Sequence, residues 1–136
     1  MARIPNLQKL ARHSGRYDAE AFSFVSQGLC HAARLLGKRG KNGAERHLCA
    51  RELIDGTLDL AADRYGLLAE LVLRSWGMRG PEDIGEITWT LIEHGVFSKQ
   101  PQDRLEDFTE APAFGPSLAQ RVQRRVMADD EAQHAE

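Results

Sequence analysis

The chain has 136 residues, of which 42% are hydrophobic and 28% are charged, and its formal net charge is −2. The length suits one domain with a core of its own, and the composition excludes wholesale disorder. The weak net charge excludes a field that could hold nucleic acid or membrane by itself, no apolar run reaches membrane-spanning length, and the two cysteines are too few for a disulfide framework.

The N-terminal third predicts two helices. Residues 1–16 are basic and predict a short docking helix or a basic arm, because Leu7 and Leu10 have helical spacing. Residues 18–36 predict a longer helix that is capped by Asp18 and stopped by Gly37. The inner face of this helix is expected to carry Phe22, Val25, Leu29, Ala32 and Leu36.

A glycine-rich basic loop follows at residues 37–46. It is not a Walker-type phosphate loop, because Gly37 and Gly40 are too close together. Over about six residues it resembles the clamp loop of KH RNA-binding domains, but a long helix stands where that domain needs a strand. We predict a solvated connector that also carries the candidate phosphate contacts Lys38, Arg39, Lys41 and Arg46.

Residues 65–108 hold both tryptophans and much of the apolar periodicity, so we expect the other segments to pack around them. Before this stretch, residues 49–64 predict a helix in which Gly56 marks a close approach to another helix. Its inner face is expected to carry Leu53, Thr57, Leu60, Ala61 and Arg64. Residues 67–76 predict a helix that Gly77 ends. Its inner stripe is expected to be Leu68, Leu71, Val72 and Ser75, with Trp76 as an anchor.

Residues 81–94 predict a helix with Pro81 in its first turn and a buried stripe of Ile84, Ile87, Thr88, Leu91 and Ile92. Residues 96–108 predict a small β-hairpin, and helices followed by a hairpin resemble a winged helix-turn-helix. In DNA-binding members the helix before the wing is basic, whereas this one begins with acidic residues that would repel phosphate. We therefore predict a protein-binding version, with candidate contacts at Glu82, Asp83, Glu86, Lys99, Asp103 and Asp107.

Residues 109–116 are linker-like. Residues 117–128 then predict a last helix with a thin apolar line at Leu118, Val122 and Val126. Its other face carries further candidate phosphate contacts at Arg121, Arg124 and Arg125. The acidic end, residues 129–136, is expected to fray.

No nucleophile elbow, dinucleotide fingerprint or kinase motif is present. Cys30, His31, His47 and Cys49 lack the spacing of a structural zinc site, so we expect buried cysteine and surface histidine. The acidic side chains around residues 86–107 allow a metal-dependent enzyme as a third hypothesis. We predict no catalytic residue, no cofactor and no metal ligand.

Over about residues 17–114 the chain resembles a family of uncharacterised bacterial proteins restricted to Verrucomicrobia and Planctomycetes. The residues that carry this resemblance are Glu52-Leu53, Gly56, Tyr65-Gly66, Trp76-Gly77, Glu82 to Ile87, Gly95, Lys99 and Glu106-Asp107-Phe108. The family implies no activity, cofactor or catalytic residue. It tends to have serine where this chain has Cys49, which would weaken a helix cap there.

The sequence therefore predicts a mainly α fold: a compact domain of four to six helices with a small β-hairpin, of which a winged helix is one form. We expect an N-terminal arm or short helix at 1–16, a core domain at 17–114, and a C-terminal helix with an acidic tail at 115–136. The expected function is a non-enzymatic, cytoplasmic adaptor or scaffold that binds a protein partner or itself, without membrane or small-molecule substrate. The alternative is nucleic-acid binding through the 37–46 loop and the arginines at 121–125.

Overall fold

The computed structural model describes residues 7–35, 37, 49–94 and 113–134, and only the backbone for 129–134. This part of the chain is mainly helical, as predicted, and contains no strand. Its elements are α1 (Leu7–Ser14), α2 (Ala19–Leu35), α3 (Ala50–Tyr65), the 3₁₀ turn η2 (Gly66–Leu68), α4 (Ala69–Ser75), α5 (Pro81–Glu93) and α7 (Phe114–His134). The predicted hairpin and the 38–46 part of the basic loop lie outside the described residues.

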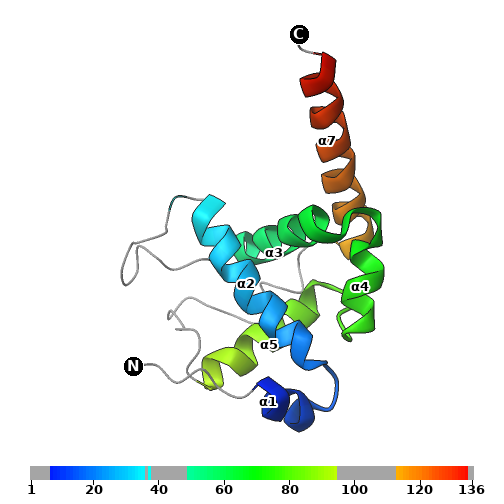
Figure 1. The fold of residues 1–136 in the computed structure, drawn as a ribbon. Coiled ribbons are helices and arrows are strands. Elements are labelled where there is room, and N and C mark those ends of the chain that lie inside the picture. Colours follow the sequence, from blue (N-terminus) through cyan, green and yellow to red (C-terminus); the bar gives the residue numbers. More distant parts are fainter. Residues whose placement is uncertain (1–6, 36, 38–48, 95–112, 135–136) are drawn as a thin grey trace.

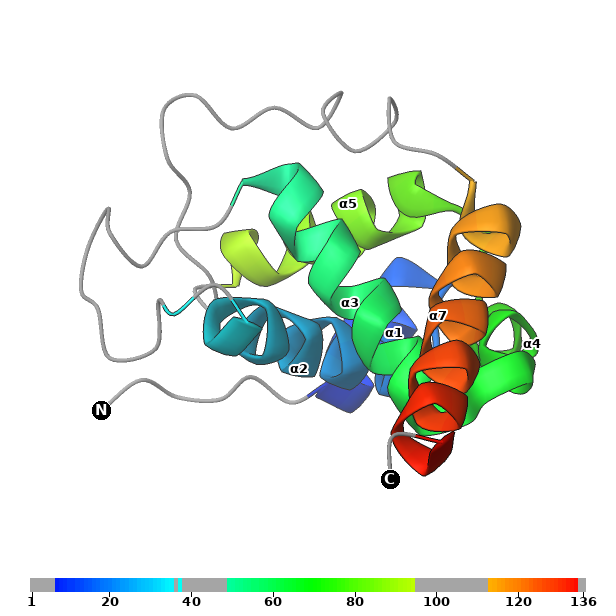
Figure 2. The ribbon, with the colours of Figure 1, turned by 90° about the horizontal axis from the view of Figure 1, so that it is seen from above.

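Helices α2 and α3 cross at the centre of the molecule (Figure 1). Helices α1 and α5 pack against α2 on one side, and α7 packs against α3 and α4 on the other. Seen from above, α7 runs beside α3, with α4 on its outer side (Figure 2). Beyond these contacts the C-terminal turns of α7 extend away from the other helices (Figure 1).

The predicted ends of α2 are confirmed. The Asp18 carboxylate accepts a hydrogen bond from the Glu20 backbone N–H at 3.0 Å, which satisfies one of the free donors of the first turn. At the other end Gly37 has φ +68°, a left-handed conformation that few other residues adopt. Phe22, Val25 and Ala32 are buried as expected.

Small residues let α2 and α3 approach closely. A Cβ atom added at Gly56 would overlap the Ala32 Cβ and lie 2.8 Å from the Ala32 Cα. A Cβ atom added at Gly28 would lie 3.0 Å from the Thr57 Cβ. The prediction that Gly56 marks a close helix–helix approach is confirmed, because neither glycine leaves room for a side chain.

The predicted inner stripe of α4 is wrong. Its buried residues are Ala69 and Leu73, whereas Leu68 and Leu71 face solvent. The physical reason lies at η2, where Gly66 has φ +53° and the helix starts again only at Ala69. The turn changes the direction of the chain and thereby selects a different face for burial.

The C-terminus of α4 is closed by Gly77, as predicted. With φ +96°, Gly77 donates its N–H to the Arg74 carbonyl at 3.0 Å, and Met78 donates to the Leu73 carbonyl at 2.9 Å. These two bonds form a Schellman motif, and the accompanying apolar pair, Leu73 and Met78, is fully buried.

In α5 the first helical residue is Pro81, as predicted, and Ile84, Ile87, Thr88 and Leu91 are buried. Helix α7 begins at Phe114, earlier than expected, because the Phe114 side chain is buried and holds the helix start on the core. Leu118 and Val122 are buried as expected, but Val126 is exposed. The backbone is helical to His134, beyond the predicted end of this helix at residue 128, and residues 135–136 lie outside the described residues.

The core centres on three phenylalanines rather than on the tryptophans. Phe22, Phe24 and Phe114 are almost fully buried. Trp76 and Trp89 are half-buried, and the Trp76 ring packs beside Phe24 at 5.4 Å between ring centroids. Leu10 of α1 and Leu118 of α7 belong to the same apolar cluster, so both terminal helices contribute to one core.

Candidate protein-interaction surface

Two of the acidic residues at the start of α5 face the body of the protein. Asp83 is buried, and its Oδ1 accepts a hydrogen bond from the Tyr17 hydroxyl at 2.6 Å. The Tyr17 hydroxyl also lies 2.7 Å from Glu86 Oε2, which accepts from Arg16 Nη1 at 2.6 Å. Glu82 is exposed. Two of the six candidate protein contacts, Asp83 and Glu86, therefore hold α5 against the α1–α2 junction. Three others, Lys99, Asp103 and Asp107, lie outside the described residues.

Asp83 also caps the helix to which it belongs. Its Oδ2 accepts hydrogen bonds from the backbone N–H groups of Arg79 at 2.8 Å and Gly80 at 3.2 Å. One carboxylate thus satisfies two donors of the turn before α5 and the hydroxyl of a residue in another part of the chain. Tyr17, which sequence reasoning did not single out, is the partner that buries it.

The pKa of Tyr17 lies far above its ordinary value. Burial disfavours the phenolate, and the hydrogen bonds to Asp83 and Glu86 favour the protonated form further. Because the folded protein keeps this proton to a higher pH than the unfolded chain does, the free energy of unfolding should fall as pH rises above about 10.

Tyr17→Phe removes this contribution. Above pH about 10, we expect the free energy of unfolding of the wild type to fall more steeply with pH than that of the Tyr17→Phe variant. The difference between the two slopes should reach up to about 1.4 kcal/mol per pH unit. Urea unfolding at several pH values between about 8 and 11 measures both slopes. Comparing the two proteins cancels the titration of their shared groups, and parallel pH profiles would contradict the assignment.

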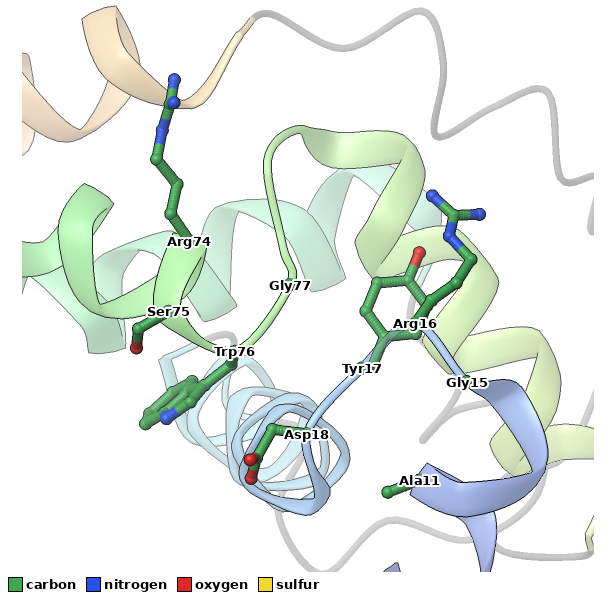
Figure 3. Close-up of a pocket in the computed structure, with 9 residues that line it drawn as sticks. All are labelled: Ala11, Gly15, Arg16, Tyr17, Asp18, Arg74, Ser75, Trp76 and Gly77. Carbon is green, nitrogen blue, oxygen red and sulfur yellow. The ribbon is translucent and has the colours of Figure 1, made fainter.

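A shallow open groove lies beside this network, between the α1–α2 junction and the end of α4. Figure 3 shows Tyr17 and Arg16 side by side, with the Tyr17 hydroxyl and the guanidinium on the same side. Arg74 and the Trp76 ring lie on the far side of the groove and point elsewhere (Figure 3). The polar groups of the groove therefore do not converge on one point, as a small-molecule site would require.

Two of the candidate phosphate contacts on α7 already have acidic partners. Arg121 Nη2 lies 3.0 Å from Asp55 Oδ1, and Arg125 bridges Asp59 at 3.0 Å and Asp63 at 2.9 Å. These ion pairs fasten α7 to α3 and balance the charge of both arginines. Arg124 is exposed. The other candidates, Lys38, Arg39, Lys41 and Arg46, lie outside the described residues.

Asp59 belongs to a polar cluster that includes a histidine. Burial by itself raises the pKa of Asp59, but the hydrogen bond to His31 and the charge of Arg125 outweigh burial, so the pKa lies below its ordinary value. The side chain of His31 is mostly buried, 2.8 Å from Asp59, and both Cys30 and Cys49 are exposed. The expectation of a buried cysteine is therefore wrong at Cys30 and Cys49, and that of a surface histidine is wrong at His31, whereas His47 lies outside the described residues.

Within residues 7–35, 49–94 and 113–128, no group of three histidine, cysteine, aspartate or glutamate side chains is placed to hold a metal ion. Among the helices that the structure describes, none is long and apolar enough to cross a bilayer.

The feature that sequence reasoning missed is an apolar surface. Six large hydrophobic side chains are exposed in the described residues, and five of them lie on η2, α4 and α7. Their exposed fractions are 89% for Leu67, 61% for Leu68, 66% for Leu71, 61% for Val126 and 56% for Met127. Leu67, Leu68 and Leu71 lie within five consecutive positions of the chain, and we call these three residues the leucine surface.

A signal for the leucine surface was present in the sequence. Residues 67–73 carry six apolar residues in seven positions, which is more than one helical stripe can bury. Some of these side chains had to remain outside the core. The pattern did not show which ones, because several choices of stripe fit it equally well.

No known protein family, curated protein or solved structure matches this chain. Membership of the family named above therefore stays a prediction that rests on the residues quoted for it.

Proposed function

We propose that this protein is a non-enzymatic protein-interaction domain and that the leucine surface is its binding surface. The observation that carries the proposal is that Leu67, Leu68 and Leu71 lie close together in η2 and at the start of α4. Each of these side chains is more than half exposed. Neighbouring apolar side chains left in water at one place on a folded surface mark interaction sites more often than scattered ones do.

The energetics favour a protein partner. Covering a leucine side chain stabilises a complex by roughly 1.5–3 kcal/mol, so a partner that covers two leucines gains enough for a specific contact. Glu70 and Arg74 form an ion pair at 3.1 Å on the same helix, and this pair can supply part of a polar rim. The acidic start of α5, where we first expected the contact, suits it less because Asp83 and Glu86 have internal partners.

A double substitution tests this proposal. The variant Leu67→Ser/Leu71→Ser should lose capture of a specific partner by at least about tenfold, because two apolar contacts are removed. Immobilised wild type and variant are incubated with cell extract, and the retained proteins are measured by quantitative mass spectrometry.

Leu35→Ser is the matched control for this experiment. Leu35 is 58% exposed and lies at the end of α2, outside the leucine surface. A partner retained by the wild type and by Leu35→Ser, but not by the double variant, supports the proposal. Equal retention by all three proteins, or no retained protein at all, contradicts it.

Nucleic-acid binding is the alternative proposal. It is supported by the exposed Arg124 and by the basic composition of residues 37–46. A mobility-shift assay at two salt concentrations tests it, since phosphate contacts predict affinity that falls steeply with salt. Absence of a shift at low salt would remove this alternative.

A further inference from the structure

We infer that the partner of the leucine surface is an amphipathic α-helix of another protein, with an acidic residue near its N-terminal end and a basic residue near its C-terminal end. This inference rests on the proposed function and states the chemistry of the partner. The observations that carry it are the helical spacing of the apolar side chains, two aromatic rings that continue the surface, and opposite charges at the two ends of those rings.

The leucine surface continues along α4 to a tryptophan. Leu68, Val72 and Trp76 are spaced by four residues and therefore follow one ridge of α4. Leu71, three residues after Leu68, lies beside this ridge. Ridges of this spacing fit the grooves of another helix. An extended peptide suits the surface less, since the residues that the structure describes contain no strand to which it could add.

Two aromatic side chains carry the apolar area from α4 toward α2 and the end of α3. The centroid of the Trp76 ring lies 6.0 Å from that of Tyr65 and 5.4 Å from that of Phe24. Phe24 is buried, whereas Tyr65 and Trp76 are half-buried. We call Tyr65 and Trp76 the aromatic strip. A partner that extends from the leucines onto this strip covers tyrosine and tryptophan, two of the residue types that contribute most to binding energy.

A positive charge lies at one end of the aromatic strip. Arg64 is exposed, and its guanidinium lies 5.9 Å from the centroid of the Phe24 ring, the ring on which Tyr65 and Trp76 also pack. This guanidinium donates a hydrogen bond to the neutral side-chain amide of Gln27. An acidic residue of the partner would therefore meet a cation that a neutral side chain holds in place.

A negative charge lies at the other end. The Asp18 backbone N–H donates to the Trp76 carbonyl at 3.0 Å, and the exposed Asp18 carboxylate accepts from a neutral donor, the Glu20 backbone N–H. Figure 3 shows the Asp18 carboxylate and the Trp76 ring directed to the same side. Asp18 and Gln27, which binds Arg64, lie nine positions apart along α2, so the two charged ends are separated by about 13 Å.

These charges give the partner helix a direction. Acidic residues stabilise the first turn of a helix and basic residues stabilise its last turn. Such a helix meets opposite charges when its N-terminal end lies beside Arg64 and its C-terminal end lies beside Asp18. A separation of about 13 Å corresponds to about nine helical residues, so its acidic and basic residues should be two to three turns apart. The apolar area is small, so we expect micromolar affinity.

Peptide selection tests the inference. A phage-displayed library of peptides about 20 residues long, enough to form a helix, is selected against the immobilised full chain. Enriched peptides should carry apolar residues at helical spacing, acidic residues in the first turns and basic residues two to three turns later. Fluorescence anisotropy measures their dissociation constants. Leu67→Ser/Leu71→Ser should weaken binding by at least about tenfold, because two apolar contacts are lost.

Two charge-removing substitutions test the ends of the strip. Arg64→Gln should weaken binding of an enriched peptide by about two- to fivefold, but not binding of the same peptide with its acidic residues changed to glutamine. Asp18→Asn keeps the cap of α2 and should weaken binding by a similar factor, unless the basic residues of the peptide are changed to glutamine. Because each peptide is compared with itself on two proteins, differences in its own helicity cancel.

Arg124→Gln is the matched control for these substitutions. Arg124 is an exposed arginine nine residues after Gly115, whose neighbour on α4 is Glu70. Nine residues are two and a half helical turns, so Arg124 lies on the side of α7 that is turned away from α4. Binding of every peptide to this variant should equal binding to the wild type.

Several results would overturn the inference. They are a selection that enriches no peptide, enriched peptides without helical spacing, and Arg64→Gln and Asp18→Asn variants that bind as the wild type does. Self-association of the wild type through the leucines, measured by analytical ultracentrifugation, would also overturn it, because a second copy would then occupy the surface.

These results are distinguishable from failure of the proposed function. If a protein from the extract is retained through Leu67 and Leu71 but the charge-removing variants bind peptides as the wild type does, the interaction surface stands and the charged helix is excluded. If enriched peptides bind equally to the wild type and to Leu67→Ser/Leu71→Ser, the leucine surface is not the binding surface and both proposals fall.

Discussion

Gly56→Ala is expected to destabilise the domain by about 2–3 kcal/mol, although alanine is the better helix former by up to about 1 kcal/mol. The sign reverses because the new methyl group would overlap the Ala32 Cβ and come within 2.8 Å of its Cα. Backbone atoms cannot turn aside as a flexible side chain can, so α2 and α3 must move apart. Urea unfolding followed by circular dichroism measures the loss as a lower midpoint.

Gly115→Ala is the matched control for the glycine substitution. Gly115 also lies in a helix, but the nearest atom to an added Cβ is Glu70 Oε2 at 3.2 Å, at the end of a flexible side chain. We expect no loss of stability there. Adding Ala32→Gly to Gly56→Ala removes one of the two clashing methyl groups and should restore part of the stability. A Gly56→Ala protein as stable as the wild type would contradict the close crossing of α2 and α3.

Asp83→Ala should cost about 3 kcal/mol of the free energy of unfolding. The substitution leaves the backbone N–H groups of Arg79 and Gly80 without their acceptor, and it removes one hydrogen-bond acceptor of the Tyr17 hydroxyl. The start of α5 and its attachment to the α1–α2 junction weaken together. Chemical denaturation monitored through the tryptophans measures the change.

Glu82→Ala serves as the control on the same helical turn. Glu82 is exposed, so we expect a change within about 0.5 kcal/mol. Asp83→Asn keeps one oxygen acceptor and should fall between Asp83→Ala and the wild type. A loss below about 1 kcal/mol for Asp83→Ala would mean that the carboxylate does not hold α5 in place.

Local chemistry was a good guide to where helices begin and end. Asp18, Gly37, Gly77 and Pro81 stand at the predicted boundaries of α2, α4 and α5. Each of these residues acts on backbone groups within a few positions of itself. A cap or a left-handed turn can therefore be inferred from a short window of sequence.

The candidate site was much less predictable. Asp83 looked like an ordinary acidic residue of a first helical turn, but Tyr17, 66 positions away, buries it. Arg121 and Arg125 looked free to contact phosphate, but α3 supplies Asp55, Asp59 and Asp63. Nothing near these residues in the sequence indicates such partners.

The sequence by itself determined the helical class, most of the helix boundaries and the close approach at Gly56, because these depend on backbone hydrogen bonds and side-chain size within one or two turns. Only the tertiary structure decided which face of α4 is buried, that Phe114 joins the core, and which charged groups neutralise one another. Those outcomes depend on contacts between segments far apart in the chain. For this reason only the packed helices show that the leucines at 67, 68 and 71 are exposed.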